Sequence, residues 1–579
     1  MFSIEECSTD RGYVKRLKLV NWRSFSECVM DLSPGLNTLV GPNDAGKSTI
    51  LEAINLAIGD VYHSSYVPPT TDFHLASCDS FEISLDISVP NTLPGWFYEK
   101  YFIQSDQHIR GNVVGVMRIV GHRDSKGLEV AFKDRMGNWQ EQSTYFLKKD
   151  VDFMYARSVR DISRHTATSF RSPLSEIRQI LSKKLTTDCK QRVLVRLREA
   201  DHELMQDGAF VELQAIIKDI VKDQTSLKEV KFSLTHPTPS ELLRHLSIVG
   251  LDTFESALET KGVGTQNSVI LALFQTLAAM CEEINIFALE EPEIGFHPHG
   301  QRLLMRRFQR LAAGGSQVFV TTHSPNLVDS DSLPNLWRVA KEELASKCYK
   351  MPTRPDLLET LDKHLAGDTT EMVFASKVLV VEGPSEVGYY PAISRKLEKD
   401  FDRHNISVVA AEGLSKVAKL VKIAKELNIP CHYVVDKSKD VKTQLFQNLL
   451  RERLITQEEF NNLPERPSNE WIQANESFLL RLRCMPTEDK AFEDMVLNNS
   501  DLFPRVLSAV NKVRKDWGEQ PLAEDILTQR DPNAQREFLM SELKHHKGRR
   551  MGYELAQIYS ESSEISPFAR RVVETLISA

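Results

Sequence analysis

The chain has 579 residues, of which 41% are hydrophobic and 26% charged, and this composition predicts several globular domains with ample core. Its net charge of -8 excludes binding to nucleic acid through overall charge and leaves only local basic patches for that purpose. Eight scattered cysteines without a C-x-x-C pair argue against a zinc ribbon and indicate reduced thiols. The N-terminus lacks the apolar core of a signal peptide, and the apolar stretch 269–281 is too short to cross a bilayer. We therefore expect a cytoplasmic protein without a membrane partner.

The first third of the chain predicts a mixed sheet around a phosphate-binding loop. Strands are indicated at Val14–Val20 and 81–89, and a hairpin is indicated at 128–138. The apolar run Leu36–Val40 leads into GPNDAGKS, which matches G-x-x-x-x-G-K-[ST] at every fixed position, and a helix is expected from Lys47 to Ala57. The residues expected to contact the phosphates and Mg²⁺ of a bound nucleoside triphosphate are Gly41, Pro42, Asn43, Asp44, Ala45, Gly46, Lys47, Ser48 and Thr49.

The middle of the chain predicts a helical arm followed by two more strands of the same sheet. Residues 172–245 have helical periodicity, whereas Ile284–Leu289 and Gln317–Thr321 are short apolar runs typical of buried strands. The first of these strands ends in Glu290-Glu291, where one acid can hold Mg²⁺ and the next can deprotonate the attacking water. On its own, the pattern is equally consistent with a strand followed by an acidic loop.

Two further segments have the residue types of a γ-phosphate site. His323 follows the second strand, where a phosphate sensor would lie, although a lone histidine is more often a buried structural residue. The glycines and hydroxyls of 261–268, including Gly264 and Ser268, precede a long apolar helix and would suit a γ-phosphate presented by a second subunit. A plain helix N-cap is the alternative for this loop.

Taken in chain order, these segments resemble ABC-type ATPase heads of the SMC and RecF kind, and the segment RLKLVNWRSFSECVMDLSPGLNTLVGPNDAGKSTILEAI is especially similar. The resemblance implies ATP as the cofactor, bound between two heads of a homo-oligomer, either a dimer or a tetramer. It also implies a role for each matching residue: Lys47 and Ser48 in Walker A, Glu290 and Glu291 in Walker B with Glu291 as the catalytic base, Gly262–Ser268 as a divergent signature loop, and His323 as the switch histidine.

The last third predicts a second α/β module. Residues 346–374 are polar and indicate a connector, and from 375 to 579 strands at 377–381, 406–411 and 432–435 alternate with helices, which predicts a parallel sheet. Glu382 and Asp436 each follow one of these strands, so their carboxylates are expected at one edge of the sheet. Such carboxylates can share Mg²⁺ or Mn²⁺, although each acid alone is typical of a solvated loop.

This module resembles a TOPRIM domain, and an ATPase followed by VEGPSE and a late lysine is similar to the OLD (overcoming lysogenization defect) nucleases, including the nuclease subunit of Gabija phage defence. The resemblance implies that Lys547 contacts the scissile phosphate. It also implies a set of metal ligands, which comprises Glu382, Glu386, Asp436, Asp440, Asp489 and Glu493 here, besides Ser48 and Glu290 in the ATPase. Two positions depart from the family pattern, because Ser438 and Ala491 stand where acids are usual.

The expected fold is thus an ABC-type P-loop ATPase head (1–171 and 246–345) with an inserted helical dimerisation arm (172–245), a connector (346–374) and a C-terminal TOPRIM α/β domain (375–579). The expected function is an ATP-regulated, divalent-metal-dependent DNA endonuclease in bacterial anti-phage defence, with a helicase-like partner as in Gabija. The alternative is an ATP-dependent DNA-binding or sensing ATPase whose TOPRIM site is catalytically weakened. A transporter ATPase would leave 377–579 unexplained, and no tyrosine nucleophile module indicates a topoisomerase.

Overall fold

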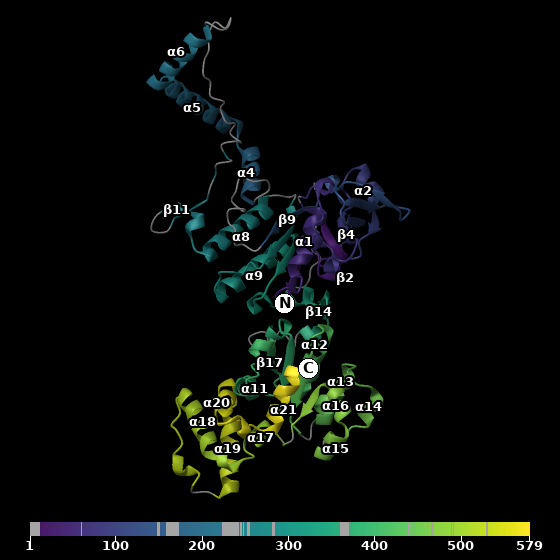
Figure 1. Ribbon diagram of the computed structural model, residues 1–579, viewed down its shortest axis with the longest axis vertical. Coiled ribbons are helices and arrows are strands. Elements are labelled where there is room, and N and C mark those ends of the chain that lie inside the picture. Colours follow the sequence, from purple (N-terminus) through teal and green to yellow (C-terminus); the bar gives the residue numbers. More distant parts are fainter. Residues whose placement is uncertain are drawn as a thin grey trace.

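Two sheets pack against helix α1 (Lys47–Ile58) in the N-terminal half of the computed structural model (Figure 1). The model describes residues 12–59, 61–147, 151–157, 173–222, 243, 246, 248–251, 255–280, 284–329, 331–358, 370–437, 441–464, 468–487, 489, 491–528 and 531–578. In α1, Ile50, Leu51 and Ile54 are fully buried against both sheets, because apolar residues recur at helical spacing after the phosphate-binding loop.

The first sheet is antiparallel, with the strand order β2-β1-β4-β6-β7-β8 and β5 paired to β6. Its alternating burial follows the alternating apolar pattern of the sequence, so one face covers the core. Its strands are β1 (Tyr13–Trp22), β2 (Phe25–Asp31), β4 (Ser80–Pro90), β5 (Phe102–Ser105), β6 (Asn112–His122), β7 (Glu129–Lys133) and β8 (Trp139–Glu141), with helix α2 (Trp96–Tyr101) before β5.

The second sheet has the order β15-β14-β3-β13-β12-β9 and is parallel except for its β14–β15 edge. Its central strands β3 and β13 are wholly buried, which agrees with the apolar residues that make up most of each strand. The strands are β3 (Leu36–Val40), β9 (Asp152–Ala156), β12 (Ile284–Glu290), β13 (Gln317–Thr321), β14 (Leu336–Glu342) and β15 (Ala345–Lys350), and the helices after them include α8 (Val263–Met280) and α9 (Pro298–Ala313).

Strand β15 corrects the predicted start of the connector at 346. Residues 345–350 pair antiparallel with β14 and so continue the ATPase sheet. The segment is polar because it forms the edge of the sheet. An edge strand forms backbone hydrogen bonds with only one neighbouring strand, and charged side chains are common there.

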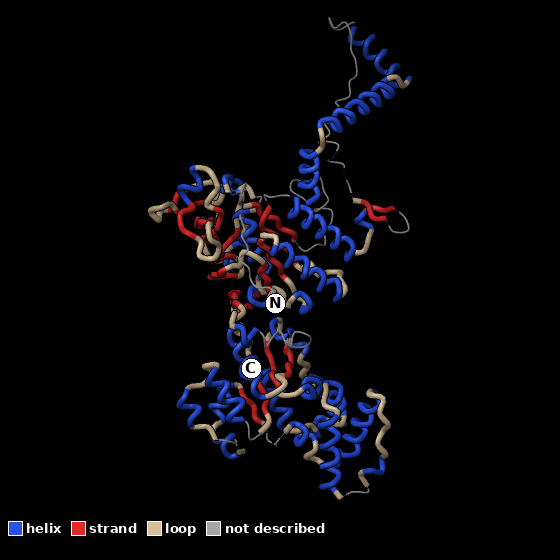
Figure 2. The backbone as a smooth tube through the Cα atoms, turned by 180° about the vertical axis from the view of Figure 1, so that it is seen from behind, coloured by secondary structure: helices blue, strands red, loops and turns tan. Residues whose placement is uncertain are grey.

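Among the described residues, three helices extend from the head where the sequence predicts the inserted arm. They are α4 (Pro173–Lys184), α5 (Thr187–Met205) and α6 (Gly208–Lys222), and a short hairpin of β10 (Val249–Leu251) and β11 (Glu255–Ala257) follows them in the chain. Helix α4 contacts α8 of the head, whereas α5 and α6 project away from both sheets in the two opposite views (Figures 1 and 2).

The C-terminal half is built on a four-stranded parallel sheet with the order β17-β16-β18-β19, as the alternation of strands and helices predicts. Leu379 and Val381 of β16 pack on the side of α11, and Val378 and Val380 pack on the side of α12, so the sheet is covered on both faces. Its strands and covering helices are β16 (Lys377–Val381), β17 (Ile406–Ala410), β18 (Cys431–Val435), β19 (Cys484–Pro486), α11 (Pro384–Lys396) and α12 (Leu414–Glu426).

Further helices lie on two sides of this four-stranded sheet (Figure 1). Those between β18 and β19 are α13 (Gln447–Arg451), α14 (Gln457–Asn461), α15 (Asn469–Ala474) and α16 (Glu476–Leu482). Those after β19 are α17 (Phe492–Val496), α18 (Phe503–Asp516), α19 (Pro532–His545), α20 (Arg549–Gln557) and α21 (Pro567–Ser578).

A shared core joins the two halves. Val40 and Leu336 of the ATPase sheet belong to the same buried cluster as Val378 of β16. At this junction the buried guanidinium of Arg338 on β14 donates hydrogen bonds to the backbone carbonyls of Leu427 and Ala375, both at 3.1 Å. The sheet that contains β3 and β14 is therefore joined by buried contacts to the C-terminal half, which is built on the four-stranded sheet. Within the part of the chain that the model describes, no helix is long and apolar enough to cross a membrane.

Candidate nucleotide site and candidate metal centre

The phosphate-binding loop has backbone conformations that only glycine adopts easily. Gly41 has φ +142° and Gly46 has φ +106°, and a Cβ on Gly41 would lie 2.0 Å from the carbonyl oxygen of Val339 on β14. The Nζ of Lys47 donates to the carbonyls of Gly41 at 3.0 Å and Pro42 at 2.8 Å, inside the loop. Burial lowers the pKa of Lys47 to about 8, against the opposing charge of Glu291.

The two acids after β12 have different surroundings. Glu290 is buried, and its Oε1 accepts a 2.5 Å hydrogen bond from the hydroxyl of Tyr155 on the neighbouring strand β9. Glu291 has a positive φ of 43°, and its backbone N–H donates to the carbonyl of Thr321 at 3.0 Å. The chain therefore turns sharply at Glu291 and presents the second carboxylate away from the strand.

That turn brings Glu291 and His323 together. The Nε2 of His323 lies 3.6 Å from Oε1 of Glu291, and both side chains are about one-third exposed. Burial lowers the pKa of His323, and the nearby ammonium of Lys47 lowers it further, so the neutral imidazole is favoured. The structure thus collects Lys47, Glu291 and His323 from three separate segments, as the sequence predicts for an ATPase site.

Sequence reasoning missed the part played by Glu293. Its Oε1 accepts hydrogen bonds from the hydroxyl of Thr322 at 2.7 Å and from the backbone N–H of His323 at 2.9 Å. Its Oε2 is buried and has no hydrogen-bond partner within the described chain, and burial raises the pKa of this carboxyl. The available signal was a third acid, two residues after Glu291 in the strand-ending acidic run.

The predicted signature loop lies at the start of α8, against the turn that follows Glu291. A Cβ on Gly264 would lie 2.4 Å from the carbonyl of Gly295, and the buried side chain of Asn267 donates to the carbonyl of Ile294. The hydroxyl of Ser268 donates to the carbonyl of Gly264 at 2.9 Å, within its own helix. The start of α8 is therefore held directly on the loop of the Walker B segment.

In the C-terminal half, five carboxylates and one lysine line a cavity of about 230 Å³, the carboxylates being those of Glu382, Glu386, Glu412, Asp436 and Glu493. Glu382 follows β16, Asp436 follows β18, and Glu386 lies in the first turn of α11, where its carboxylate accepts the N–H of Gly383 at 2.7 Å. Glu493 comes from α17, and its Oε1 lies 2.7 Å from the Nζ of Lys547. Residues up to 165 positions apart therefore meet at one end of the parallel sheet.

A close helix contact places Lys547 at this cavity. A Cβ on Gly388 of α11 would lie 1.9 Å from the carbonyl of Arg549, and one on Gly552 of α20 would lie 1.6 Å from the carbonyl of Ser385. The two backbones thus touch, and the N–H of Gly548 donates to the hydroxyl of Ser385 at 3.1 Å. Lys547, directly before Gly548, is delivered to the cavity by this contact.

The carboxylates of the cavity are short of positive charge. Glu382 Oε2 and Asp436 Oδ1 are buried, and among the described residues neither has a hydrogen-bond partner. Burial raises the pKa of Glu382 and Glu386, and burial together with Glu382 raises that of Asp436 to about 8. For Lys547, burial opposes the charge, but the Glu493 carboxylate raises its pKa. Unpaired carboxylate oxygens at a strand end suit a hard divalent cation such as Mg²⁺ or Mn²⁺.

One described residue that was predicted as a metal ligand is not brought into this cluster. Asp489 does not line the cavity, and its Oδ2 instead accepts a hydrogen bond from Asn498 at 2.7 Å. The hydroxyl of Thr487 also donates to the Asp489 carbonyl, which fixes this turn before α17. Asp440 lies outside the described residues.

Comparison with known protein families supports the assignments made for the N-terminal half and for the C-terminal half of the chain. Residues 13–112 and 118–328 match the model of the AAA ATPase domain family. The chain belongs to that family. Residues 373–437 match the TOPRIM domain of proteins like the overcoming lysogenization defect protein, which confirms the resemblance to OLD proteins and the predicted order of the two domains.

The curated relatives of this OLD-family ATPase that span most of the chain are distant, at 21–26% identity. An OLD nuclease of Thermus scotoductus is 26% identical over 483 residues, 80% of this chain and 88% of that protein. Endonuclease GajA of Bacillus cereus is 21% identical over 417 residues, 67% of this chain and 68% of GajA. The Old nuclease of Escherichia phage P2 is 24% identical over 229 residues, 36% of this chain and 39% of that protein.

Proposed function

We propose that this OLD-family ATPase is an ATP-regulated, divalent-metal-dependent DNA endonuclease that acts in bacterial anti-phage defence. The observation that carries the proposal is the cavity in which Glu382, Glu386, Asp436 and Glu493 face Lys547. The names of the relatives, OLD nuclease and endonuclease GajA, agree with it.

At the nuclease site, the carboxylates of Glu382, Glu386, Asp436 and Glu493 would hold Mg²⁺ or Mn²⁺. Such an ion supplies an activated water and stabilises the leaving oxygen in phosphodiester hydrolysis. Lys547, half-exposed beside Glu493, can swing to a phosphate oxygen and stabilise the charge that develops on it. The basic run 544–550 next to it offers a local patch for backbone phosphates on an otherwise acidic chain.

At the ATPase site, Lys47 and the loop N–H groups would bind the phosphates of ATP, and Ser48 and Glu290 would hold Mg²⁺. Glu291 would act as general base on the attacking water, with the neutral imidazole of His323 beside it. The Arg338 junction between the two sheets gives a direct route by which the nucleotide state can affect the nuclease site.

Self-association belongs to the same proposal, because Gly264 and Ser268 would complete the nucleotide site of a second head. Helices α5 and α6 project from the head and would support such a homodimer. Mixing Lys47→Ala chains with chains altered at Gly264 should restore part of the ATPase activity through composite sites. Full activity in a verified monomer would contradict this arrangement.

Purified protein incubated with plasmid and Mg²⁺ or Mn²⁺, with and without ATP, tests the nuclease proposal. We expect nicked or linear products only with metal, and none from Glu382→Ala. If wild type cuts nothing with either metal, the second candidate gains support, an ATP-dependent DNA-binding or sensing ATPase with a weakened TOPRIM site. The position of Asp489 outside the cavity favours that candidate, since it removes one carboxylate that was expected to bind the metal.

A further inference from the structure

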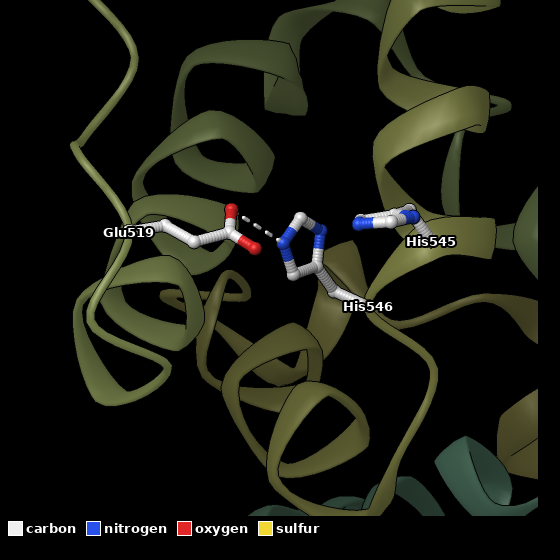
Figure 3. Close-up of side chains that lie close together, drawn as sticks. All are labelled: Glu519, His545 and His546. Atoms are coloured by element: carbon white, nitrogen blue, oxygen red, sulfur yellow. Dashed lines mark hydrogen bonds and ion pairs between the residues drawn. The ribbon is translucent and has the colours of Figure 1, made fainter.

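Two histidines and one carboxylate gather beside Lys547, outside the nuclease cavity (Figure 3). Glu519 lies in the turn after α18, His545 is the last residue of α19, and His546 follows it. One ligand atom from each side chain lies within 4.8 Å of the other two. In Figure 3 the ring of His546 lies between the Glu519 carboxylate and the His545 ring.

The hydrogen bonds of His546 leave room for one additional positive charge. Its side chain is fully buried, with Nδ1 3.0 Å from the carbonyl oxygen of Glu542 and Nε2 3.1 Å from Oε2 of Glu519. Both neighbours are acceptors, whereas a neutral imidazole has a single N–H to donate. If Nδ1–H serves the carbonyl, the lone pair of Nε2 faces a carboxylate, and a metal ion bound by both groups would remove this repulsion. Metal-ligating histidines are commonly oriented in this way by a backbone carbonyl.

The ligand types favour a borderline metal ion over a hard one. Imidazole nitrogens with one carboxylate suit Zn²⁺, whereas Mg²⁺ prefers a shell of oxygens. Tetrahedral Zn²⁺ with bonds of about 2.1 Å places its ligand atoms about 3.4 Å apart, so the three groups must close somewhat. His545 is exposed and free to turn toward the site, and Arg514, 3.2 Å from Glu519, already offsets part of the local negative charge.

We propose that Glu519, His545 and His546 bind a Zn²⁺-class ion that fixes the turn carrying Lys547. The two histidines directly precede Lys547, and Gly548 after it is bonded to Ser385 beside the nuclease carboxylates. An ion here would tie the turn after α18 to the end of α19 on one side of Lys547. The effect on Lys547 rests on the proposed nuclease function, whereas the binding of the ion does not.

Co²⁺ titration of the chelator-treated full chain, in excess Mg²⁺ to occupy the carboxylate cavity, tests the site. Co²⁺ serves as the spectroscopic probe for Zn²⁺, and we expect about one equivalent with tetrahedral visible absorption that Zn²⁺ displaces. The fluorescence of Trp517 should fall on binding, because its ring centroid lies 5.2 Å from that of His546. His545→Ala and Glu519→Gln, both changes at accessible side chains, should weaken Co²⁺ binding at least tenfold.

Two control variants make the result decisive. His404→Ala changes an exposed histidine elsewhere and should bind Co²⁺ as wild type does. Glu382→Ala should also keep the signal, and loss of the signal there would assign the ion to the nuclease cavity and overturn the proposal. Equal affinity in His545→Ala and wild type, or no tetrahedral signal at all, would overturn it as well. A chain that binds Co²⁺ through His545 but cuts no DNA would refute the proposed function alone.

Discussion

The backbone N–H of His323 donates a 2.9 Å hydrogen bond to Oε1 of Glu293, and the hydroxyl of Thr322 donates to the same oxygen at 2.7 Å. Glu293 belongs to the loop after β12, and His323 follows β13, so one carboxylate ties together the ends of two parallel strands. The catalytic assignment of Glu291 and His323 depends on this tie, since their side chains meet at 3.6 Å only if both loops keep their positions.

Glu293→Ala should therefore slow ATP hydrolysis more than it weakens ATP binding. The substitution leaves two buried donors without an acceptor, at a cost of about 1–3 kcal/mol for each, and frees the loop that carries His323. We expect kcat to fall at least tenfold with the Kd for ATP little changed, measured by steady-state hydrolysis and by nucleotide titration. Glu293→Gln keeps a carbonyl acceptor and should retain most activity. If the alanine variant has the kcat of wild type, Glu293 does not position His323.

Glu291→Gln should bind ATP and hydrolyse it about a hundredfold more slowly, because only the carboxylate that accepts the proton of water is lost. Lys47→Ala serves as the contrasting variant and should abolish binding itself, since its ammonium is the charge within the phosphate loop. Nucleotide titration separates the two effects. A wild-type hydrolysis rate in Glu291→Gln would move the role of base to Glu290.

Lys547→Ala should abolish DNA cleavage and leave ATP hydrolysis largely intact, because the lysine faces the carboxylate cavity and is remote in sequence from the ATPase motifs. Asp489→Asn is the matched control. Its carboxylate accepts a hydrogen bond from Asn498 outside the cavity, so cleavage should stay near the wild-type rate. Plasmid nicking and phosphate release, measured on the same samples, give both rates. Parallel loss of the two activities in Lys547→Ala would indicate misfolding or a structural role.

The sequence predicts the elements that carry strong local patterns. Strands β3, β13 and β16 begin and end where the sequence predicts them, because parallel strands buried on both faces are made mostly of apolar residues. The acids at the ends of β12, β16 and β18 were likewise expected, since parallel strands place their carboxyl ends at one edge.

Contacts between distant segments could not be predicted in the same way. The close backbone contact of α11 with α20, at Gly388 and Gly552, leaves no periodic signal, yet it places Lys547. Asp489 lies before the short helix α17, and Glu493 lies within it. Only their positions in the folded chain determine that Glu493 lines the cavity and Asp489 does not. Glu293 appears in the sequence as one more acid of a loop, and its role depends on a strand 24 residues later.

Arg338→Met should weaken the connection between the ATPase sheet and the TOPRIM sheet. The buried guanidinium bridges to the carbonyls of Ala375 and Leu427, and its loss leaves these acceptors unpaired. We expect one cooperative thermal transition in wild type and a lower or split transition in the variant, measured by calorimetry. Cleavage by Arg338→Met should also respond less to ATP. An unchanged transition together with an unchanged ATP response would exclude this route of communication.

Metal binding at the TOPRIM cavity should strengthen with pH up to about 8. The pKa of Asp436 is raised from its usual 3.8 to about 8. Between these two pH values the metal-free folded chain keeps a proton that the unfolded chain has already lost. This term therefore destabilises the metal-free fold progressively as pH rises from about 4 to about 8, and it is constant above that range. Mg²⁺ must displace the proton, so its affinity should rise about tenfold per pH unit below 8 for one proton released.

Thermal unfolding with EDTA or with Mg²⁺ at pH 6 and pH 8 measures this dependence. The increase in Tm that Mg²⁺ produces should be clearly larger at pH 8, because the carboxylates are then available to the ion. Asp436→Asn removes the titrating carboxyl and should flatten the pH dependence of the metal-free Tm as well as reduce the Mg²⁺ effect. The same Mg²⁺-induced shift at both pH values in wild type would mean that Asp436 is already ionised without metal. In that case Oδ1 of Asp436, which has no hydrogen-bond partner among the described residues, would need a cation from the chain itself. Lys547 lines the same cavity and is the candidate, which Lys547→Ala would test.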